Sequence, residues 1–259
     1  MLRQPQGEAG RRTRATFGKP TGAGPAAYAE IRLSSRAFLR TVVRMKFVLV
    51  EDQVMFRGLI RRLLVEDCAG KVVLEAGSLT EVRANMASLR TADVLLLDIR
   101  LPDGDGIDFV DELVKAHVPT PVLLFSSSCE DYIVHRVSRA FVQGFVHKDE
   151  DPKILLTAIQ MVAAGGAFFS PRFVERQRRL AGDQSSFDKL LSPREQEFLK
   201  LIGSGCTDAE AAAELGLGSA TAQTHRRNVM GKLNLHSAQE LQAYALKMGF
   251  TTIDRLHSA

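Results

Sequence analysis

The stretch that most constrains the fold of this chain covers residues 92–109 and reads ADVLLLDIRLPDGDGIDF. Within it, one acidic residue, Asp98, interrupts an apolar run that extends from residue 94 to residue 99. A short apolar run bounded by turn signals is typical of a buried strand in a parallel sheet. The Asp-Gly-Asp-Gly sequence that follows indicates a loop, and helical spacing resumes at Ile107. Asp98 is therefore expected where a buried strand ends and a loop begins.

The position predicted for Asp98 is one where a carboxylate needs a partner. In open α/β sheets, ligands bind beside the carboxyl ends of the strands. A buried carboxylate costs solvation free energy unless a cation, a proton or a chemical role compensates for its charge. The rest of the sequence must therefore supply whatever compensates for the charge of Asp98.

Asp98 belongs to the third of five strand–helix units that follow one another between residues 45 and 165. Apolar runs predict strands at residues 46–50, 71–76, 93–98, 121–125 and 144–146. Helical spacing predicts helices at residues 54–65, 79–89, 107–116, 131–140 and 152–164. This alternation predicts an α/β domain with a five-stranded parallel sheet and helices on both faces, the flavodoxin-like arrangement with strand order 2-1-3-4-5.

The chain beyond this region has a different pattern. A Gly-Gly pair, a Ser-Pro pair and a charged run predict a linker at residues 166–190 that is helical in part. Two capping boxes follow, which begin at Ser192 and at Thr207. A glycine-containing turn then precedes a helix at residues 219–233, which predicts a helix-turn-helix. We expect an all-α domain of four helices at residues 191–259.

Composition and charge limit the class of protein further. The 259 residues are 45% apolar, which supports two packed domains. The net charge is +4, but residues 1–44 alone carry +7, so residues 45–259 carry −3. This basic segment has few large apolar residues and is expected to be a disordered extension. No apolar run is long enough for a membrane span or a signal peptide. The three cysteines lack metal-ligand spacing, which is typical of free thiols in the cytoplasm.

Four further residues follow strands of the predicted sheet and converge on Asp98. Glu51 and Asp52 come directly after the first strand, which neighbours the third strand in the expected order. Three carboxylates that lie this close repel one another, and a hard divalent cation with oxygen ligands would relieve the repulsion. Ser126 ends the fourth strand and Lys148 follows the fifth. A hydroxyl and an ammonium group in these places suit an oxyanionic group that forms on Asp98.

This set, together with Pro102 and Gly106 in the same order and spacing, resembles the receiver domain of two-component response regulators. The resemblance covers residues 45–165. It implies that Asp98 accepts a phosphoryl group from a sensor histidine kinase. It also implies that Ser126 and Lys148 bind phosphoryl oxygens and that Phe145 is the aromatic switch residue. The Mg²⁺ ligands that it implies are Glu51, Asp52, Asp98 and the main-chain carbonyl of Arg100.

The C-terminal segments LSPREQEFLKLI, THRRNVMGKLNLHS and YALKMGF resemble the LuxR-type helix-turn-helix of the NarL/FixJ subfamily of response regulators. The helix at residues 219–233 has three basic residues and no acidic one, which suits a helix that enters the major groove of double-stranded DNA. The resemblance implies contacts to base edges from Gln223, Thr224 and Arg227. It implies positions near the DNA backbone for Thr221, His225, Arg226 and Lys232.

The combined expectation is a cytoplasmic transcription regulator that dimerises and binds DNA when Asp98 is phosphorylated, with no membrane partner. Its enzymatic chemistry would be limited to its own phosphorylation and dephosphorylation. A phosphatase of the haloacid dehalogenase type needs a second aspartate where this chain has Arg100. A quorum-sensing regulator shares the C-terminal domain but lacks the acidic set. An atypical regulator that binds DNA without phosphorylation stays open as an alternative.

Overall fold

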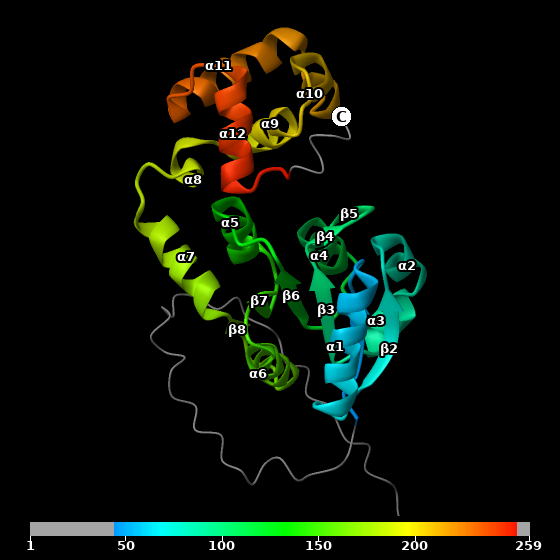
Figure 1. Cartoon of the computed structure of the whole chain (residues 1–259). Coiled ribbons are helices and arrows are strands. Elements are labelled where there is room, and N and C mark those ends of the chain that lie inside the picture. Colours follow the sequence, from blue (N-terminus) through cyan, green and yellow to red (C-terminus); the bar gives the residue numbers. More distant parts are fainter. Residues whose placement is uncertain (1–43, 253–259) are drawn as a thin grey trace, which may run out of the picture. The chain divides into compact units, whose positions relative to one another are not determined.

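The computed structural model describes residues 44–252, and within them the central element is a six-stranded parallel sheet (Figure 1). Its strands lie in the order β2-β1-β3-β6-β7-β8. Their bounds are β1 Lys46–Val50, β2 Lys71–Ala76, β3 Val94–Asp98, β6 Val122–Ser126, β7 Gly144–His147 and β8 Phe168–Phe169. The predicted flavodoxin-like arrangement is confirmed for the first five strands of this order.

The prediction of five strands was one too few, because β8 extends the sheet. Gly165 adopts a positive φ of 83° and turns the chain back after the preceding helix. Phe168 N then donates to Gln143 O at 2.9 Å, and Ser170 N donates to Phe145 O at 2.9 Å. A strand of two residues is too short to show the alternation that sequence patterns detect.

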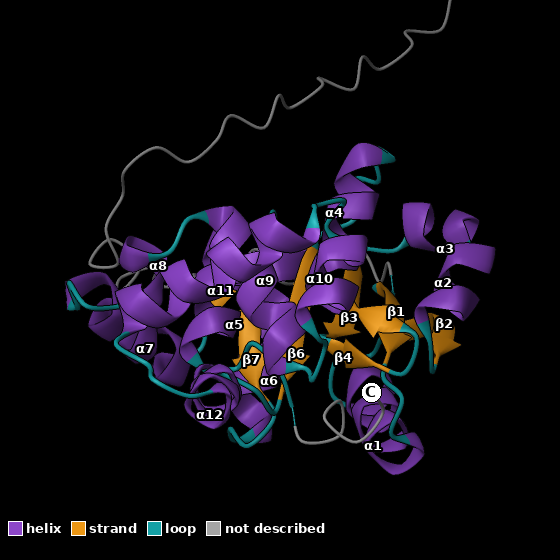
Figure 2. Ribbon diagram, turned by 90° about the horizontal axis from the view of Figure 1, so that it is seen from above, coloured by secondary structure: helices purple, strands orange, loops and turns teal. Residues whose placement is uncertain are grey.

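Helices cover both faces of the sheet, as Figure 2 shows around the orange strands. Along β3, Leu95 and Leu97 belong to one core, whereas Val94 and Leu96 belong to the other. This two-residue alternation is that of a strand buried on both faces. The helices that pack against the core with Val94 and Leu96 are α1 Val54–Glu66 and α6 Pro152–Ala163. The helices that pack against the core with Leu95 and Leu97 include α2 Leu79–Ala84, α3 Met86–Thr91, α4 Gly106–Lys115 and α5 Asp131–Arg139.

The single helix predicted at residues 79–89 is divided into α2 and α3 at Asn85. The side-chain Nδ2 of Asn85 donates to Glu81 O at 2.8 Å. Asparagine side chains compete in this way for main-chain carbonyls, which explains the break. A small antiparallel pair, β4 Arg100–Leu101 and β5 Gly104–Asp105, shapes the loop after Asp98.

The C-terminal part consists of four helices packed around a shared core. Their bounds are α9 Pro193–Gly203, α10 Asp208–Glu214, α11 Ser219–Leu233 and α12 Ala238–Met248. Both predicted capping boxes are present, at Ser192 with Glu195 and at Thr207 with Glu210. Val229 and Ala222 of α11 are fully buried, so one side of that helix faces the core.

The segment predicted as a linker is largely helical. It contains α7 Pro171–Gly182 and the single turn α8 Phe187–Leu190. Helix α7 lies against α5, and its Arg176 and Arg179 both pair with Asp131, at 2.8 Å and 2.7 Å. Apart from Arg44, the basic extension predicted at residues 1–44 lies outside the described residues. Within residues 44–252, none of the helices is both long and apolar enough to cross a membrane.

Candidate functional site

The carboxyl ends of β1 and β3 bring three carboxylates together, as the sequence predicts. The two strands are neighbours, with Val50 paired to Leu97, so Glu51 and Asp98 follow at the same edge. One oxygen from each of Glu51, Asp52 and Asp98 lies within 4.8 Å of the others. Glu51 is fully buried and Asp98 is 3% exposed, whereas Asp52 faces solvent. The edge of the sheet therefore concentrates negative charge away from water.

Lys148 supplies one positive charge to this cluster. Its Nζ lies 2.6 Å from Asp98 Oδ2 and 2.7 Å from Glu51 Oε2. The ammonium group also lies 4.9 Å from the ring centre of Phe56 and 5.2 Å from that of Phe125, which favours a cation. One ammonium group cannot neutralise three carboxylates, so the site keeps an excess of negative charge.

Burial makes the two buried carboxylates of this cluster, Asp98 and Glu51, easier to protonate. Desolvation raises the pKa of Asp98 above its ordinary value, although Lys148 acts to lower it. Desolvation likewise raises the pKa of Glu51; Lys148 opposes this shift and the charge of Asp98 adds to it. Both carboxylates are thus less stable in their ionised form than they would be in water.

The donor set fits a hard divalent cation such as Mg²⁺. Glu51 Oε2 forms an ion pair with Lys148, but the geometry is not that of a hydrogen bond, and no donor among the described residues satisfies this buried oxygen. Carboxylate oxygens are the ligands that Mg²⁺ prefers in proteins. The Glu51 oxygen that accepts no hydrogen bond among the described residues, the neighbouring carboxylates and the excess charge together provide what such an ion requires.

The loops beside Asp98 hold the rest of the predicted set in place. Ser126 is 1% exposed and ends β6. The residue before it, Phe125, is the register partner of Asp98 in β3. Arg100 N donates to Asp98 Oδ1 at 3.3 Å. A Cβ atom on Gly106 would lie 2.2 Å from the carbonyl oxygen of Asp98, so only glycine permits this close approach. The glycine in the sequence motif thus has a steric reason.

Sequence reasoning missed the contacts that the Arg100 side chain and Asp103 make in this loop region. Arg100 Nε donates to Ser128 Oγ at 2.9 Å and so connects the loop after β3 with the loop after β6. Asp103 accepts hydrogen bonds from the main chain of Leu79 and Thr80, at 2.8 Å and 2.7 Å. These contacts join loops that are far apart in the sequence, so no local pattern could reveal them.

The predicted switch residue, Phe145, lies in the core. Its side chain is fully buried, and its ring centre lies 4.9 Å from that of Phe173 in α7. Phe173 in turn lies 5.2 Å from Phe169 of β8. The aromatic residue of β7 therefore contacts the segment that leads to the C-terminal helices.

The residues predicted to contact DNA differ in their surroundings on α11. Gln223, Thr224 and Arg227, predicted to reach bases, are exposed, and so is Thr221. Arg226 instead pairs with Asp208 at 2.7 Å, and Lys232 pairs with Glu195 at 2.7 Å. The last predicted contact is His225, which is partly buried with its ring 5.9 Å from Phe198. Contacts of all these side chains with DNA stay predictions.

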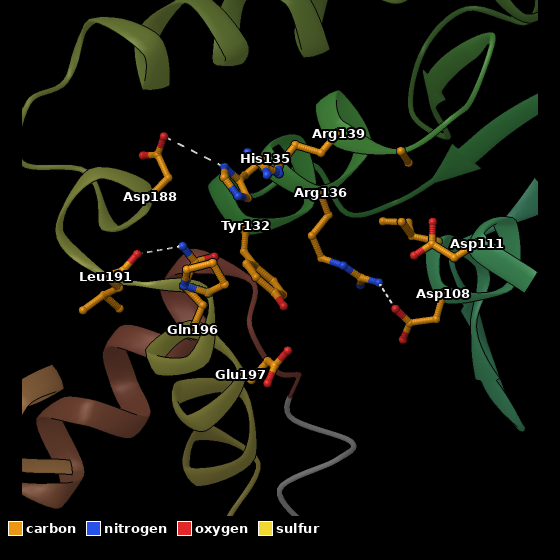
Figure 3. A pocket seen from close by; sticks show the side chains of 13 residues that line it. Asp108, Asp111, Tyr132, His135, Arg136, Arg139, Asp188, Leu191, Gln196 and Glu197 are labelled. Carbon is orange, nitrogen blue, oxygen red and sulfur yellow. Dashed lines mark hydrogen bonds and ion pairs between the residues drawn. The ribbon is translucent and has the colours of Figure 1, made fainter. Parts of the chain in front are cut away.

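A cavity of about 330 Å³ lies among residues of α4, α5, α8 and α9 (Figure 3). Two arginines, Arg136 and Arg139, and four carboxylates, Asp108, Asp111, Asp188 and Glu197, are among the residues that line it. Arg136 pairs with Asp105 at 2.7 Å and with Asp108 at 2.6 Å. Burial acts to raise the pKa of Asp105, but the guanidinium of Arg136 outweighs burial and holds that pKa below its ordinary value. With His135 counted as neutral, the charged side chains that line the cavity carry a formal excess of two negative charges.

The sheet, the acidic edge with its lysine, and the four-helix domain define the class of protein as a DNA-binding response regulator. Residues 47–160 match the response regulator receiver domain, and residues 189–245 match the bacterial regulatory proteins of the luxR family. The chain is 31% identical over 201 residues to the Fimbriae Z protein of Escherichia coli K12, covering 76% of this chain and 94% of that one. It is 30% identical over 192 residues to the nitrate/nitrite response regulator protein NarP of the same strain, covering 73% and 89%.

Solved structures give the same result. The chain is similar to the response regulator RcsB of Salmonella enterica serovar Typhimurium bound to promoter rprA with the phosphomimetic BeF3⁻. The identity is 26%, the TM-score is 0.59, and the match covers 78% of this chain and 98% of that one. An RcsB–DNA complex matches with 25% identity and a TM-score of 0.55, over 79% and 98% of the two chains. The chain belongs to the response regulators of the NarL/FixJ type and regulates transcription.

Proposed function

We propose that Asp98 accepts a phosphoryl group from a sensor histidine kinase and that this event controls DNA binding by the C-terminal helices. The observation that carries the proposal is the buried Asp98 carboxylate, 2.6 Å from Lys148 and beside two further carboxylates. A carboxylate oxygen attacks phosphorus, and the bond from phosphorus to the donor's leaving group breaks. The product is an acyl phosphate on Asp98.

The chain's own residues position the group that is transferred. Lys148 already lies at Asp98 Oδ2 and is placed to pair with a phosphoryl oxygen, and the Ser126 hydroxyl lies at the neighbouring strand end. Glu51, Asp52, Asp98 and the main-chain carbonyl of Arg100 would hold Mg²⁺. When bound, Mg²⁺ neutralises charge on the transferring phosphoryl group. We assign no turnover of a second substrate to this site.

The output that we propose is binding of a homodimer to paired half-sites in double-stranded DNA, in the cytoplasm. The exposed side chains Gln223, Thr224 and Arg227 lie on one helix, and such a helix fits the major groove. Arginine reads guanine and glutamine reads adenine with paired hydrogen bonds. An RcsB relative was solved as two dimers bound to two parallel DNAs, which supports a dimer for this chain as well.

The test is to incubate the full chain with acetyl phosphate and Mg²⁺ and to measure its intact mass. We expect the wild-type chain to gain one phosphoryl group and Asp98→Asn to gain none. Asp52→Asn serves as the control: it keeps the acceptor and should be labelled more slowly, with a higher Mg²⁺ requirement. Labelling of Asp98→Asn at the wild-type rate would overturn the assignment.

A further inference from the structure

His147 is a buried histidine at the phosphoryl-binding edge for which the proposed chemistry gives no role. It ends β7, directly before Lys148, and it is 2% exposed. Its register partner in β6 is Ser126. His147 and Phe145 are two residues apart, so they point to the face of β7 opposite to that of Lys148. The histidine therefore faces away from the carboxylates, although it adjoins the same edge of the sheet.

The partners of the imidazole fix its proton. Nε2 lies 3.0 Å from the carbonyl oxygen of Ser127, which only accepts hydrogen bonds, so Nε2 must donate. Nδ1 accepts from the main-chain N–H of Asp149 at 3.2 Å. Both nitrogens are satisfied by one neutral tautomer with its proton on Nε2. The ring thus joins the strand end after Ser126 to the loop after Lys148.

A third contact leads from this ring to helix α7. Arg172, in the first turn of α7, places Nη1 3.5 Å from His147 Nδ1 and 3.7 Å from Asp149 Oδ2. Phe145 lies on the same face of β7 and contacts Phe173, the next residue of α7. One face of β7 therefore touches two consecutive residues of the helix that leads to the DNA-binding domain.

We propose that His147 is a positioning residue that holds the main chain at Ser126 and Ser127 and transmits its position to α7 through Arg172. This inference rests on the proposed phosphorylation of Asp98. A phosphoryl group on Asp98 that accepts a hydrogen bond from the Ser126 hydroxyl would move the main chain on which the imidazole is anchored.

Two substitutions test the roles of the two imidazole nitrogens separately. The amide of His147→Gln reaches toward the place of Nε2 and keeps a donor for Ser127, whereas His147→Asn reaches only to the place of Nδ1 and loses that donor. We expect His147→Asn to slow labelling by acetyl phosphate about fivefold to tenfold, which is the effect of one neutral hydrogen bond. His147→Gln should stay within about twofold of the wild-type rate. The Mg²⁺ concentration for half-maximal labelling should not change in either variant, because no metal ligand is altered.

The link to α7 is tested by hydrogen exchange of the amides of residues 172–182 in the full chain, with and without beryllofluoride. We expect beryllofluoride to change the exchange of α7 in the wild-type chain and in Arg178→Ala, an exposed arginine of the same helix. Arg172→Ala should label at the wild-type rate but lose at least about half of this change.

The outcomes distinguish the two proposals. A wild-type chain that is never labelled refutes the proposed function, and this inference falls with it. If the wild-type chain is labelled, two results would overturn the inference and leave the proposed function standing. One is labelling of His147→Asn at the wild-type rate, and the other is an equal response of α7 to beryllofluoride in Arg172→Ala and Arg178→Ala. Arg172→Ala keeps the test valid even where a change of the buried histidine prevents folding.

Discussion

Replacing Asp98 by asparagine should stabilise the chain in the absence of divalent metal. Asp98 and Glu51 have carboxylate oxygens within 4.8 Å of each other, and at an effective dielectric constant of about 20 two such charges repel by about 3 kcal/mol or more. The substitution would remove this repulsion and, above all, the cost of desolvating the Asp98 carboxylate, but it would also lose the charge-assisted hydrogen bond with Lys148, which contributes about 1.5–3 kcal/mol. We expect a net gain of about 1–2 kcal/mol in the free energy of unfolding, because Lys148 keeps its ion pair with Glu51.

The gain should depend on pH with a definite sign. Burial raises the pKa of Asp98 above its ordinary value of 3.8, so the folded chain holds this proton more tightly than the unfolded chain. The free energy of unfolding therefore falls as the pH rises from about 4 through the raised pKa. The advantage of Asp98→Asn should be full at pH values above the raised pKa and should shrink as the pH falls toward about 4.

The assay is thermal unfolding followed by circular dichroism in buffer with EDTA. A gain of this size should raise the midpoint by about 2–8 °C for a chain of this length. Asp111→Asn removes an exposed carboxylate from α4 and serves as the matched control, with no comparable rise expected. An Asp98→Asn midpoint at or below that of the wild-type chain at neutral pH would refute the electrostatic reasoning. Added Mg²⁺ should then stabilise the wild-type chain more than the variant.

Two further predictions concern the cations of the two domains. Lys148→Met should lower the free energy of unfolding by about 3–5 kcal/mol without metal, because it leaves Glu51 and Asp98 buried with no positive partner from that residue. The same unfolding assay checks this, and a variant as stable as wild type would contradict it. Arg227→Ala should weaken binding to a selected operator by about 1–3 kcal/mol, measured by fluorescence anisotropy, whereas Lys247→Ala on α12 should bind within about twofold of wild type. Equal losses in both variants would mean that α11 does not read the DNA.

The acidic cluster could be predicted from the sequence because the chain topology determines which strand ends lie side by side. Parallel strands that are joined by helices must present their carboxyl ends at one edge, so residues that directly follow β1 and β3 meet there. The position of Lys148 beside Asp98 follows in the same way from β7. What local patterns could not supply is the pairing of side chains from distant segments, such as Arg100 with Ser128.

In the C-terminal helices too, features set by neighbouring residues could be predicted, whereas contacts between helices could not. Helix starts were predictable because capping boxes are local and are fixed by a spacing of three residues. The ion pairs of Arg226 with Asp208 and of Lys232 with Glu195 join different helices, so a reading of α11 alone could not foresee them. Strand β8 was missed for a further reason, since two residues carry too little periodicity.

The most direct test of the central claim is to measure the affinity of the full chain for an operator fragment selected from genomic DNA, before and after treatment with acetyl phosphate and Mg²⁺. The account predicts that treatment raises the affinity of the wild-type chain by at least about fivefold and leaves Asp98→Asn unchanged. If the wild-type chain is labelled at Asp98 but binds the operator equally well in both states, phosphorylation does not control DNA binding, and the account is contradicted.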